Sequence, residues 1–301
     1  MSKKIAASIV LYNPEIARLK ENISSVINQV NQIVLVDNGS KNIEEIDSLE
    51  IVKNHCVLVK NRENKGLARA LNQAMEWAAA NKYEWVLTLD QDSVVDEKLI
   101  QGLAKHIDKE KIGIIAPKYL DRNSKRLSDI ETGWKFVLRC ITSASLTKVS
   151  VWREVGGFNE ELFIDYVDYD FCARIVRNGY GIIMDSDAMI LHEIGHAKQI
   201  FFGNRSYVLY NHSAFRDYYI VRNTLYYCYA YPDVWDVKKE KKDLWIRIMM
   251  IAIFEQNRWE KICAMFKGWK DSKRLISDEK KRKKKTTKDV KDRFNNYAKL
   301  K

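Results

Sequence analysis

Two carboxylates, Asp90 and Asp92, form the first group of residues in this 301-residue chain whose types and spacing could do chemistry. They stand two positions apart, directly after an apolar run, and a tight turn could let both face one divalent cation through oxygen ligands. A hard cation at that point would most usefully hold a diphosphate. Short acidic pairs also occur by chance, so the position of this pair directly after a predicted strand is what supports a metal site here.

A second acidic segment holds Asp165, Asp168 and Asp170. On an extended backbone Asp168 and Asp170 would share a face, and one carboxylate could act as a general base that takes a proton from an attacking hydroxyl. The structural alternative is that acidic side chains in the first turn of a helix complement the helix dipole, and this alternative applies to Asp170 above all.

His192 and His196 are spaced as in the zinc-protease motif HExxH. Here the motif follows a short predicted strand, Gly195 interrupts it, and the sequence offers no evident third ligand. A single imidazole, that of His192, completing the coordination of a cation held by Asp92 fits this context better than a zinc protease does. An ordinary core or surface histidine is the alternative.

Apolar runs alternate with helical patterns over the first 116 residues, which predicts βαβ units and a largely parallel sheet. Polar clusters follow the predicted strands, and in open α/β sheets ligands bind at the carboxyl ends of the strands. The sequence therefore predicts one site built from several strand ends. The predicted strands are 5–11, 33–36, 57–59, 85–89 and 112–116, the predicted helices are about 15–30 and 67–80, and the polar clusters are 12–13, 37–38, 64–66 and 90–92.

Two phosphate-binding loops, GxGxxG and GxxxxGK[ST], are absent from the sequence, which argues against a dinucleotide enzyme and a P-loop NTPase.

After residue 119 the alternation of apolar runs and helical patterns becomes weaker. The sequence there predicts a turn at 156–158, a helix ending at Gly179, short strands at 180–184 and 188–191, a helix at 216–231, and one or two amphipathic helices over 244–269.

Charge is concentrated at the C-terminal end. Residues 267–301 contain 15 Lys and Arg against 5 Asp and Glu, a net charge of +10 out of +11. Such a segment suits an anionic lipid surface or a nucleic acid, and equally a solvated tail.

The five cysteines form no CxxC pair, no apolar run reaches the length of a membrane span, and the first residues do not resemble a secretory signal. We therefore expect a reduced, cytoplasmic chain.

Seven motifs, in this order, resemble inverting family 2 glycosyltransferases with the GT-A fold. The motifs are IVLYNP, LVDNGS, ENKGLARALNQ, LTLDQDS, GGFNEELFIDYVDYDFCAR, ILHEIGH and RDYYIVRN. The form LDQDS and the string RDYYIVRN are similar to bacterial rhamnosyltransferases that build surface polysaccharides. The resemblance covers roughly residues 5–225.

The resemblance implies a role for each matching residue. Asp168 matches the catalytic base, although Val167 stands where many relatives have Glu, so the base could instead be Asp165 or Asp170. Asp92 and His192 match the ligands of a Mg²⁺ or Mn²⁺ ion. The other matches are Val10, Tyr12, Asp37, Asn38, Asn64, Lys65, Gly66 and Asp90 for the sugar nucleotide, and more loosely Asp165, Arg216, Tyr218, Tyr219 and Arg222 for the acceptor or the diphosphate.

The resemblance also implies an α/β fold with a mostly parallel sheet flanked by helices. Residues 1–225 would form the GT-A domain, with a nucleotide-sugar half at about 1–116 and an acceptor half at about 117–225. Residues 226–301 would form a helical, basic extension. The expected reaction moves L-rhamnose from dTDP-rhamnose to a lipid-linked saccharide in the synthesis of a cell-surface polysaccharide, at the cytoplasmic, anionic face of the membrane.

Other functions remain open at this point. A transferase of the same fold could use a different UDP- or dTDP-sugar, and a homologue could have lost catalysis. A nucleotidyltransferase normally needs a basic, Gly-rich loop near the N-terminus, which IVLYNP does not supply. A nucleic-acid binder would explain the basic tail but not the ordered acids at the strand ends, so we expect no nucleic-acid partner.

Overall fold

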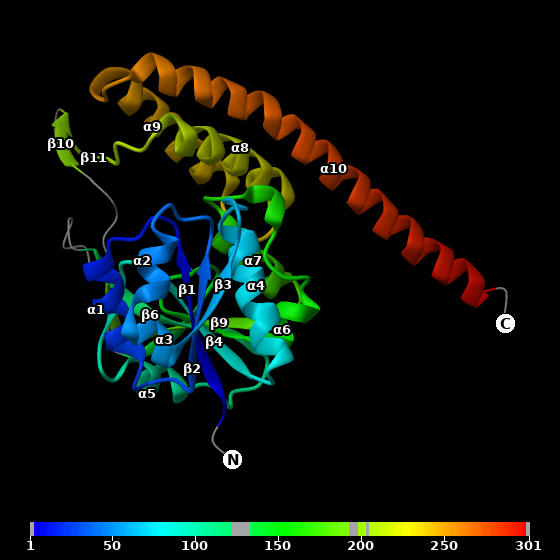
Figure 1. The fold of residues 1–301 in the computed structure, drawn as a ribbon. Coiled ribbons are helices and arrows are strands. Elements are labelled where there is room, and N and C mark those ends of the chain that lie inside the picture. The colour runs from blue at the N-terminus through cyan, green and yellow to red at the C-terminus, as the bar shows by residue number, and fades with distance from the viewer. Residues whose placement is uncertain (1–2, 122–132, 193–197, 203–204, 299–301) are drawn as a thin grey trace. The chain divides into compact units, whose positions relative to one another are not determined.

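The computed structural model describes residues 3–121, 133–192, 198–202 and 205–298, and it groups the chain into two compact units, 1–210 and 211–301. The first unit contains the α/β sheet (Figure 1). The second contains three helices, α8 (Ala214–Ala230), α9 (Val237–Phe254) and α10 (Arg258–Ala298). Helix α8, most of which the sequence assigned to the first domain, thus belongs to the helical unit.

Four parallel strands form the N-terminal half of the sheet, in the order β3-β2-β1-β4. β1, β2 and β4 are mostly buried, as expected for strands covered on both faces, whereas β3 at the edge of the sheet is partly exposed. The register pairs Leu11 with Asp37 and Val10 with Asp90, so the polar residues that follow these strands meet at one edge. The strands are β1 (Ile5–Leu11), β2 (Gln32–Asp37), β3 (Cys56–Lys60) and β4 (Trp85–Asp90).

Helices α1 (Ile16–Val26) and α4 (Leu67–Ala80) follow β1 and β3. Ala70 and Ala74 of α4 pack against Val34 and Val36 of β2, because small side chains let the helix approach the sheet closely. Helix α4 has the bounds that the sequence predicted, whereas α1 ends at Val26, four residues before the predicted end, in a turn that leads to β2. Two short helices, α2 (Ile43–Ser48) and α3 (Glu50–His55), complete this half.

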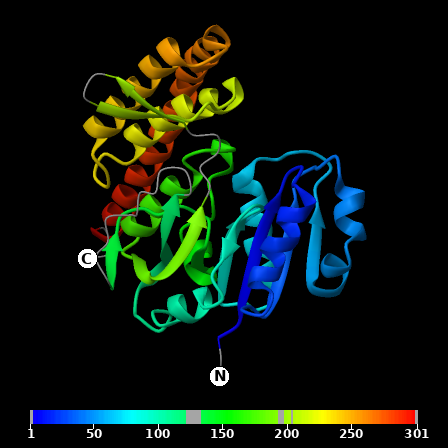
Figure 2. The same ribbon diagram turned by 90° about the vertical axis from the view of Figure 1, so that its left-hand side faces the viewer.

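The second half of the sheet is mixed. Strand β8 (Ser145–Lys148) lies antiparallel between β4 and β6 (Ile112–Asp121), and β6 pairs in parallel with β9 (Gly181–His192). Figure 2 shows this later, green half beside the blue N-terminal half. The two short strands predicted at 180–184 and 188–191 are one strand, β9, with a register shift against β6. The remaining elements are β5 (Val94–Val95), α5 (Leu99–Ala104), β7 (Trp134–Val137), α6 (Val149–Glu154), η1 (Glu160–Leu162), α7 (Val167–Arg177), β10 (Lys198–Phe202) and β11 (Arg205–Leu209).

In the helical unit, α8 and α10 pack closely. Gly268 of α10 lies against the backbone carbonyl of Tyr218 with no room for a Cβ atom, and the Tyr218 hydroxyl donates to Asp271 at 2.7 Å. The buried carboxylate of Asp217 pairs with Arg247 of α9 at 2.9 Å. The basic C-terminal segment is helical as far as Ala298. Within the described part of the chain, no helix combines the length and apolar character that a membrane crossing requires.

Candidate functional site

Asn38, directly after β2, organises the carboxyl edge of the sheet. Its side-chain amide donates to Asn64 Oδ1 at 2.9 Å and to the Gly66 carbonyl at 3.2 Å. Its side-chain oxygen accepts from the Lys65 N–H at 3.0 Å and from the Asn61 amide at 3.2 Å. These bonds hold the predicted 64–66 turn beside the end of β2, so two of the predicted nucleotide-binding clusters lie in one place.

Asp37 is buried at the end of β2, and its carboxylate accepts the N–H groups of Gly39 and Ser40 at 3.1 to 3.3 Å. A carboxylate has about four acceptor positions, so these bonds leave capacity for a ligand. Tyr12 is exposed, and its backbone N–H donates to Gln91 Oε1 at 2.9 Å. The ends of β1 and β4 are therefore joined as well.

Gly66 connects the 64–66 turn to the acidic segment. Its φ of +85° favours glycine, and a Cβ atom there would lie 2.6 Å from the ring of Phe163 and 2.9 Å from its Cα. The next residue, Leu67, donates its N–H to the Phe163 carbonyl at 2.6 Å. The backbone that leads to Asp168 is thus held directly against the turn.

We expect Gly66→Ala to destabilise the protein by about 1–3 kcal/mol and to weaken sugar-nucleotide binding, because the backbone is left-handed and Phe163 must move. Gly156→Ala is the matched control, since Gly156 has the same φ and nothing within 4 Å of its Cβ position. Thermal unfolding and calorimetric titration with the donor measure both effects. Equal losses in the two variants would show that the contact with Phe163 contributes nothing.

The segment before Asp168 is strained. Phe163, Asp165 and Tyr166 all have positive φ, at 65°, 60° and 66°. Such conformations cost about 1–3 kcal/mol each and cluster at functional sites. They turn the chain abruptly into α7, whose first turn contains Asp168.

Asp168 lies in the first turn of α7 and is half-buried. Burial is the largest cause that raises the pKa of its carboxyl to about 7; repulsion from Asp165 and Asp90 adds to this rise, and a hydrogen bond from the Tyr169 N–H opposes it. The repulsion from Asp90 means that the acid at the end of β4 lies close enough to the acid of α7 to influence its charge. A carboxylate with a pKa near 7 is suited to accept a proton at neutral pH.

Asp170 has a different environment. Its side chain is fully buried and pairs with Arg174 of the same helix, with Nε and Nη2 at 2.9 and 2.8 Å from Oδ2. Arg174 also donates to the Val155 carbonyl at 2.8 Å. These contacts support a structural role for Asp170 and leave Asp168 or Asp165 as the candidate base.

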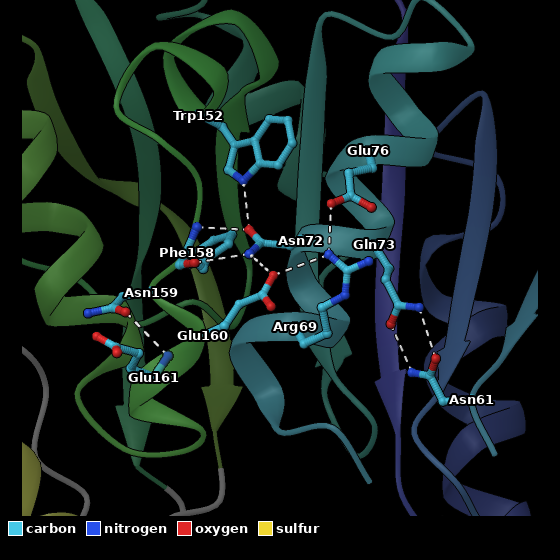
Figure 3. Close-up of polar contacts among 10 residues, drawn as sticks. All are labelled: Asn61, Arg69, Asn72, Gln73, Glu76, Trp152, Phe158, Asn159, Glu160 and Glu161. Atoms are coloured by element: carbon cyan, nitrogen blue, oxygen red, sulfur yellow. Dashed lines mark hydrogen bonds and ion pairs between the residues drawn. The ribbon is translucent and has the colours of Figure 1, made fainter. Parts of the chain in front are cut away.

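Asn72 joins α4 to the chain that leads into the acidic segment (Figure 3). Its amide donates to the Phe158 carbonyl at 2.9 Å and to Glu160 at 2.8 Å. Its oxygen accepts from the Trp152 indole at 3.0 Å and from the Phe158 N–H at 2.8 Å. Arg69, one turn earlier on α4, pairs with Glu160 at 3.2 Å. Helix α4, which follows the 64–66 turn, is thus bonded through Asn72 and Arg69 to the segment that leads into α7.

The proposed cation ligands are Asp92, in the turn between β4 and β5, and His192, the last residue of β9. Val94 of β5 pairs with Leu191 of β9 in antiparallel register, so the end of β9 runs beside the strand that follows this turn. Asp92 is exposed, and the described residues contain no cluster of three or more His, Cys, Asp and Glu side chains. One carboxylate and one imidazole nevertheless fit Mg²⁺ or Mn²⁺, because such ions keep water and substrate phosphates among their ligands.

Other residues of the site gave no clear signal in the sequence. Asn22, a polar residue on the buried face of α1, donates to the Asp90 carbonyl at 2.6 Å and so fixes the end of β4. An asparagine inside the apolar stripe of a helix was the sign in the sequence that could have identified it.

The residues predicted to contact the acceptor or the diphosphate lie on α8 in the other unit, and their role stays a prediction. They are Arg216, Tyr219 and Arg222.

Comparisons with known proteins identify the family of this chain. A family model described as Glycosyl transferase family 2 matches residues 8–155. A Shigella flexneri protein named dTDP-rhamnosyl transferase RfbF is 30% identical over an alignment of 239 residues, which covers 74% of this chain and 79% of the relative. Glycosyltransferase GlyG of Streptococcus pneumoniae is 28% identical over 173 residues, 54% of this chain and 55% of the relative.

Solved structures support the fold. S. aureus TarS 1-349 has a TM-score of 0.56 at 14% identity, over 88% of this chain and 80% of that chain. GalNAc-T7, solved with UDP, GalNAc and Mn²⁺, has a TM-score of 0.55 at 16% identity, over 83% of this chain but 56% of that longer chain. At these identities the likeness concerns the fold alone, and it confirms the expected α/β architecture.

Proposed function

The chain belongs to glycosyltransferase family 2 and has the fold of the GT-A glycosyltransferases, and from this we propose that it transfers L-rhamnose from dTDP-rhamnose to a saccharide hydroxyl with inversion. The observation that carries the proposal is the carboxylate of Asp168, which has a pKa of about 7, is repelled by Asp90 and follows a segment held against the 64–66 turn by the bond from Leu67 to Phe163. The nucleotide would lie over the edge formed by Asp37, Asn38 and Asn64.

The donor assignment is supported by the S. flexneri relative, whose name states a dTDP-rhamnosyl transferase. The alignment with this relative covers about three quarters of this chain. A different nucleotide sugar is the second candidate, because S. aureus TarS 1-349 was solved in complex with UDP.

The reaction follows from the charges in the site. Asp168 takes the proton from the acceptor hydroxyl, whose oxygen forms a bond to the anomeric carbon while the bond from that carbon to the diphosphate breaks. One displacement inverts the anomeric centre and leaves a nucleoside diphosphate. A divalent cation on Asp92 and His192 would supply Lewis-acid neutralisation of the leaving diphosphate. Asn38 and the 64–66 turn would orient the nucleotide.

A screen of sugar nucleotides tests the proposal. Purified protein with Mg²⁺ or Mn²⁺ is mixed with each UDP- and dTDP-sugar, and thermal stabilisation and slow donor hydrolysis are measured. We expect dTDP-rhamnose to give the largest stabilisation and to release dTDP. Release of UDP from another donor instead would replace the donor assignment. Formation of pyrophosphate from a nucleoside triphosphate and a sugar phosphate would favour a nucleotidyltransferase.

Removal of divalent cations should lower turnover at least about tenfold, because a charged diphosphate is a poor leaving group without neutralisation. Added Mg²⁺ or Mn²⁺ should restore turnover. Asp92→Asn should raise the cation concentration needed for half-maximal activity, whereas Glu97→Gln, which changes an exposed carboxylate of the following turn, should leave it unchanged. Full turnover in a chelator would exclude a metal role.

For the acceptor we propose a saccharide carried on a lipid diphosphate, as used in the synthesis of bacterial surface polysaccharides. Such an acceptor lies at the cytoplasmic face of the membrane, so the enzyme would bind there peripherally. The net charge of +10 in residues 267–301 supports this location, because anionic lipids attract basic segments.

A further inference from the structure

Helix α10 leaves one face exposed between Trp259 and Lys273. Trp259, Phe266 and Trp269 lie on this face, and Trp259 is 75% exposed. Lys270 and Lys273 continue the same face, since positions three and four apart share a side of a helix. The Lys270 ammonium lies 4.7 Å from the centre of the Phe266 ring, and that of Lys273 lies 3.9 Å from the Trp269 ring.

The opposite side of α10 is the packed side. Met265, Gly268, Ser272 and Leu275 are buried, and Gly268 lies directly against the backbone of α8. The helix therefore has its core contact already, and the aromatic residues of its other side are not needed for folding of the helical unit. Large apolar side chains that remain exposed in this way mark a binding surface.

Helix α9 repeats the pattern. Trp245, Met249 and Ile253 follow one another at intervals of four residues, and all are exposed, Trp245 to 65%. Exposed lysines at 238, 241 and 242 lie at the other end of the helix. In both helices the apolar part adjoins the short connection at 255–257 and the basic part lies away from it.

Two kinds of partner could cover such residues, and charge selects between them. A second copy of the chain would bring lysines toward lysines, which is unfavourable. An anionic bilayer can bind both the aromatic residues and the lysines, because Trp and Phe insert at the level of the headgroups while Lys contacts the phosphates. The described residues of α9 and α10 are also too polar to cross the bilayer, so they would lie in its surface.

We propose that the exposed residues of α9 and α10 form a membrane-docking face for anionic lipid. The face is defined as Trp245, Met249, Ile253, Trp259, Phe266, Trp269, Lys270 and Lys273. Its binding rests on aromatic insertion as well as on charge, which separates it from simple attraction of the basic C-terminal segment. The inference deepens the proposed function, since a lipid-linked acceptor lies in such a membrane, but it does not depend on the identity of the sugar.

Vesicle flotation of the full chain tests the proposal. The vesicles are phosphatidylcholine alone or mixed with phosphatidylglycerol, without saccharide lipid, at low and high salt. We expect binding to the mixed vesicles only, and a loss of affinity of at least about tenfold for Trp259→Ser/Phe266→Ser. Phe136→Ser/Leu138→Ser, which changes two exposed apolar residues in the other unit, should bind normally.

A charge-matched pair separates the face from the net charge. Lys270→Glu/Lys273→Glu should weaken vesicle binding strongly, whereas Lys53→Glu/Lys98→Glu, with the same net charge but exposed lysines of the first unit, should change it little. Donor binding is measured on every variant to confirm folding, and failure of the donor assignment leaves this test intact. Equal binding by face and control variants would overturn the proposal. So would a dimer that dissociates when Trp259 and Phe266 are replaced.

Discussion

Replacing Asp168 by Asn is expected to lower turnover by about 10²- to 10⁴-fold while the affinity for the sugar nucleotide changes little. The amide keeps the size of the side chain but cannot take the proton of the acceptor hydroxyl. Calorimetric titration with the donor and a steady-state assay of dTDP release measure the two properties separately. Lost donor affinity with normal turnover would reverse the assignment and make Asp168 a binding residue.

The same carboxyl predicts the pH dependence. Its pKa is raised to about 7 in the folded protein, so kcat/KM should fall as the pH drops below about 7, where the base becomes protonated. Asp165→Asn removes a negative charge that repels the Asp168 carboxylate. The fall of kcat/KM on the acidic side of the pH profile should therefore occur at lower pH, with turnover retained. If Asp165→Asn instead abolishes turnover, Asp165 is the base, which the sequence left as an alternative.

Stability should change in the opposite direction to activity. The folded-state pKa of Asp168 lies above its ordinary value of 3.8, so the fold disfavours the charged form. The stability that the neutral carboxyl contributes is complete below about pH 4 and is lost as the pH rises through 7. Asp168→Asn should therefore have a higher Tm than the unmodified protein at pH 8, and a similar Tm at pH 4. A lower Tm at pH 8 would contradict the raised pKa of this residue.

The second large effect is expected from Asp170→Ala, which should destabilise the protein by about 3–5 kcal/mol. The substitution removes a fully buried carboxylate and leaves the Arg174 guanidinium without its ion-pair partner inside the fold. Denaturant unfolding measures the change. The substitution should destabilise α7 as a whole, since Arg174 of this helix also donates a hydrogen bond to the Val155 carbonyl.

The comparison of Asp168 with Asp170 is itself a test. Where Asp170→Ala remains folded, it should keep the acidic limb of the pH profile, because the proton acceptor is elsewhere. Arg174→Met, which removes the other partner, should destabilise to a similar degree. A stable Asp170 variant without activity would move the catalytic role to Asp170 and remove the basis for assigning it to Asp168.

The sequence by itself determined much of the first unit. Continuous apolar runs such as 5–11 and 85–89 predicted strands, the alanine-rich pattern at 67–80 predicted α4 with its bounds, and the polar residues after the strands predicted where the site would lie. These features are local, because a buried parallel strand or a helix is specified by the period of its own apolar residues. The order of the motifs also indicated the family.

Tertiary structure decided how those residues act. Asp168 and Asp170 are two positions apart and chemically identical. The Asp168 carboxyl nevertheless has a raised pKa, whereas the Asp170 carboxylate forms an ion pair with Arg174. Neither the left-handed backbone before α7 nor the contact of Gly66 with Phe163 follows from local sequence. Burial and the charges of distant residues set a pKa, and only the folded chain brings those residues together.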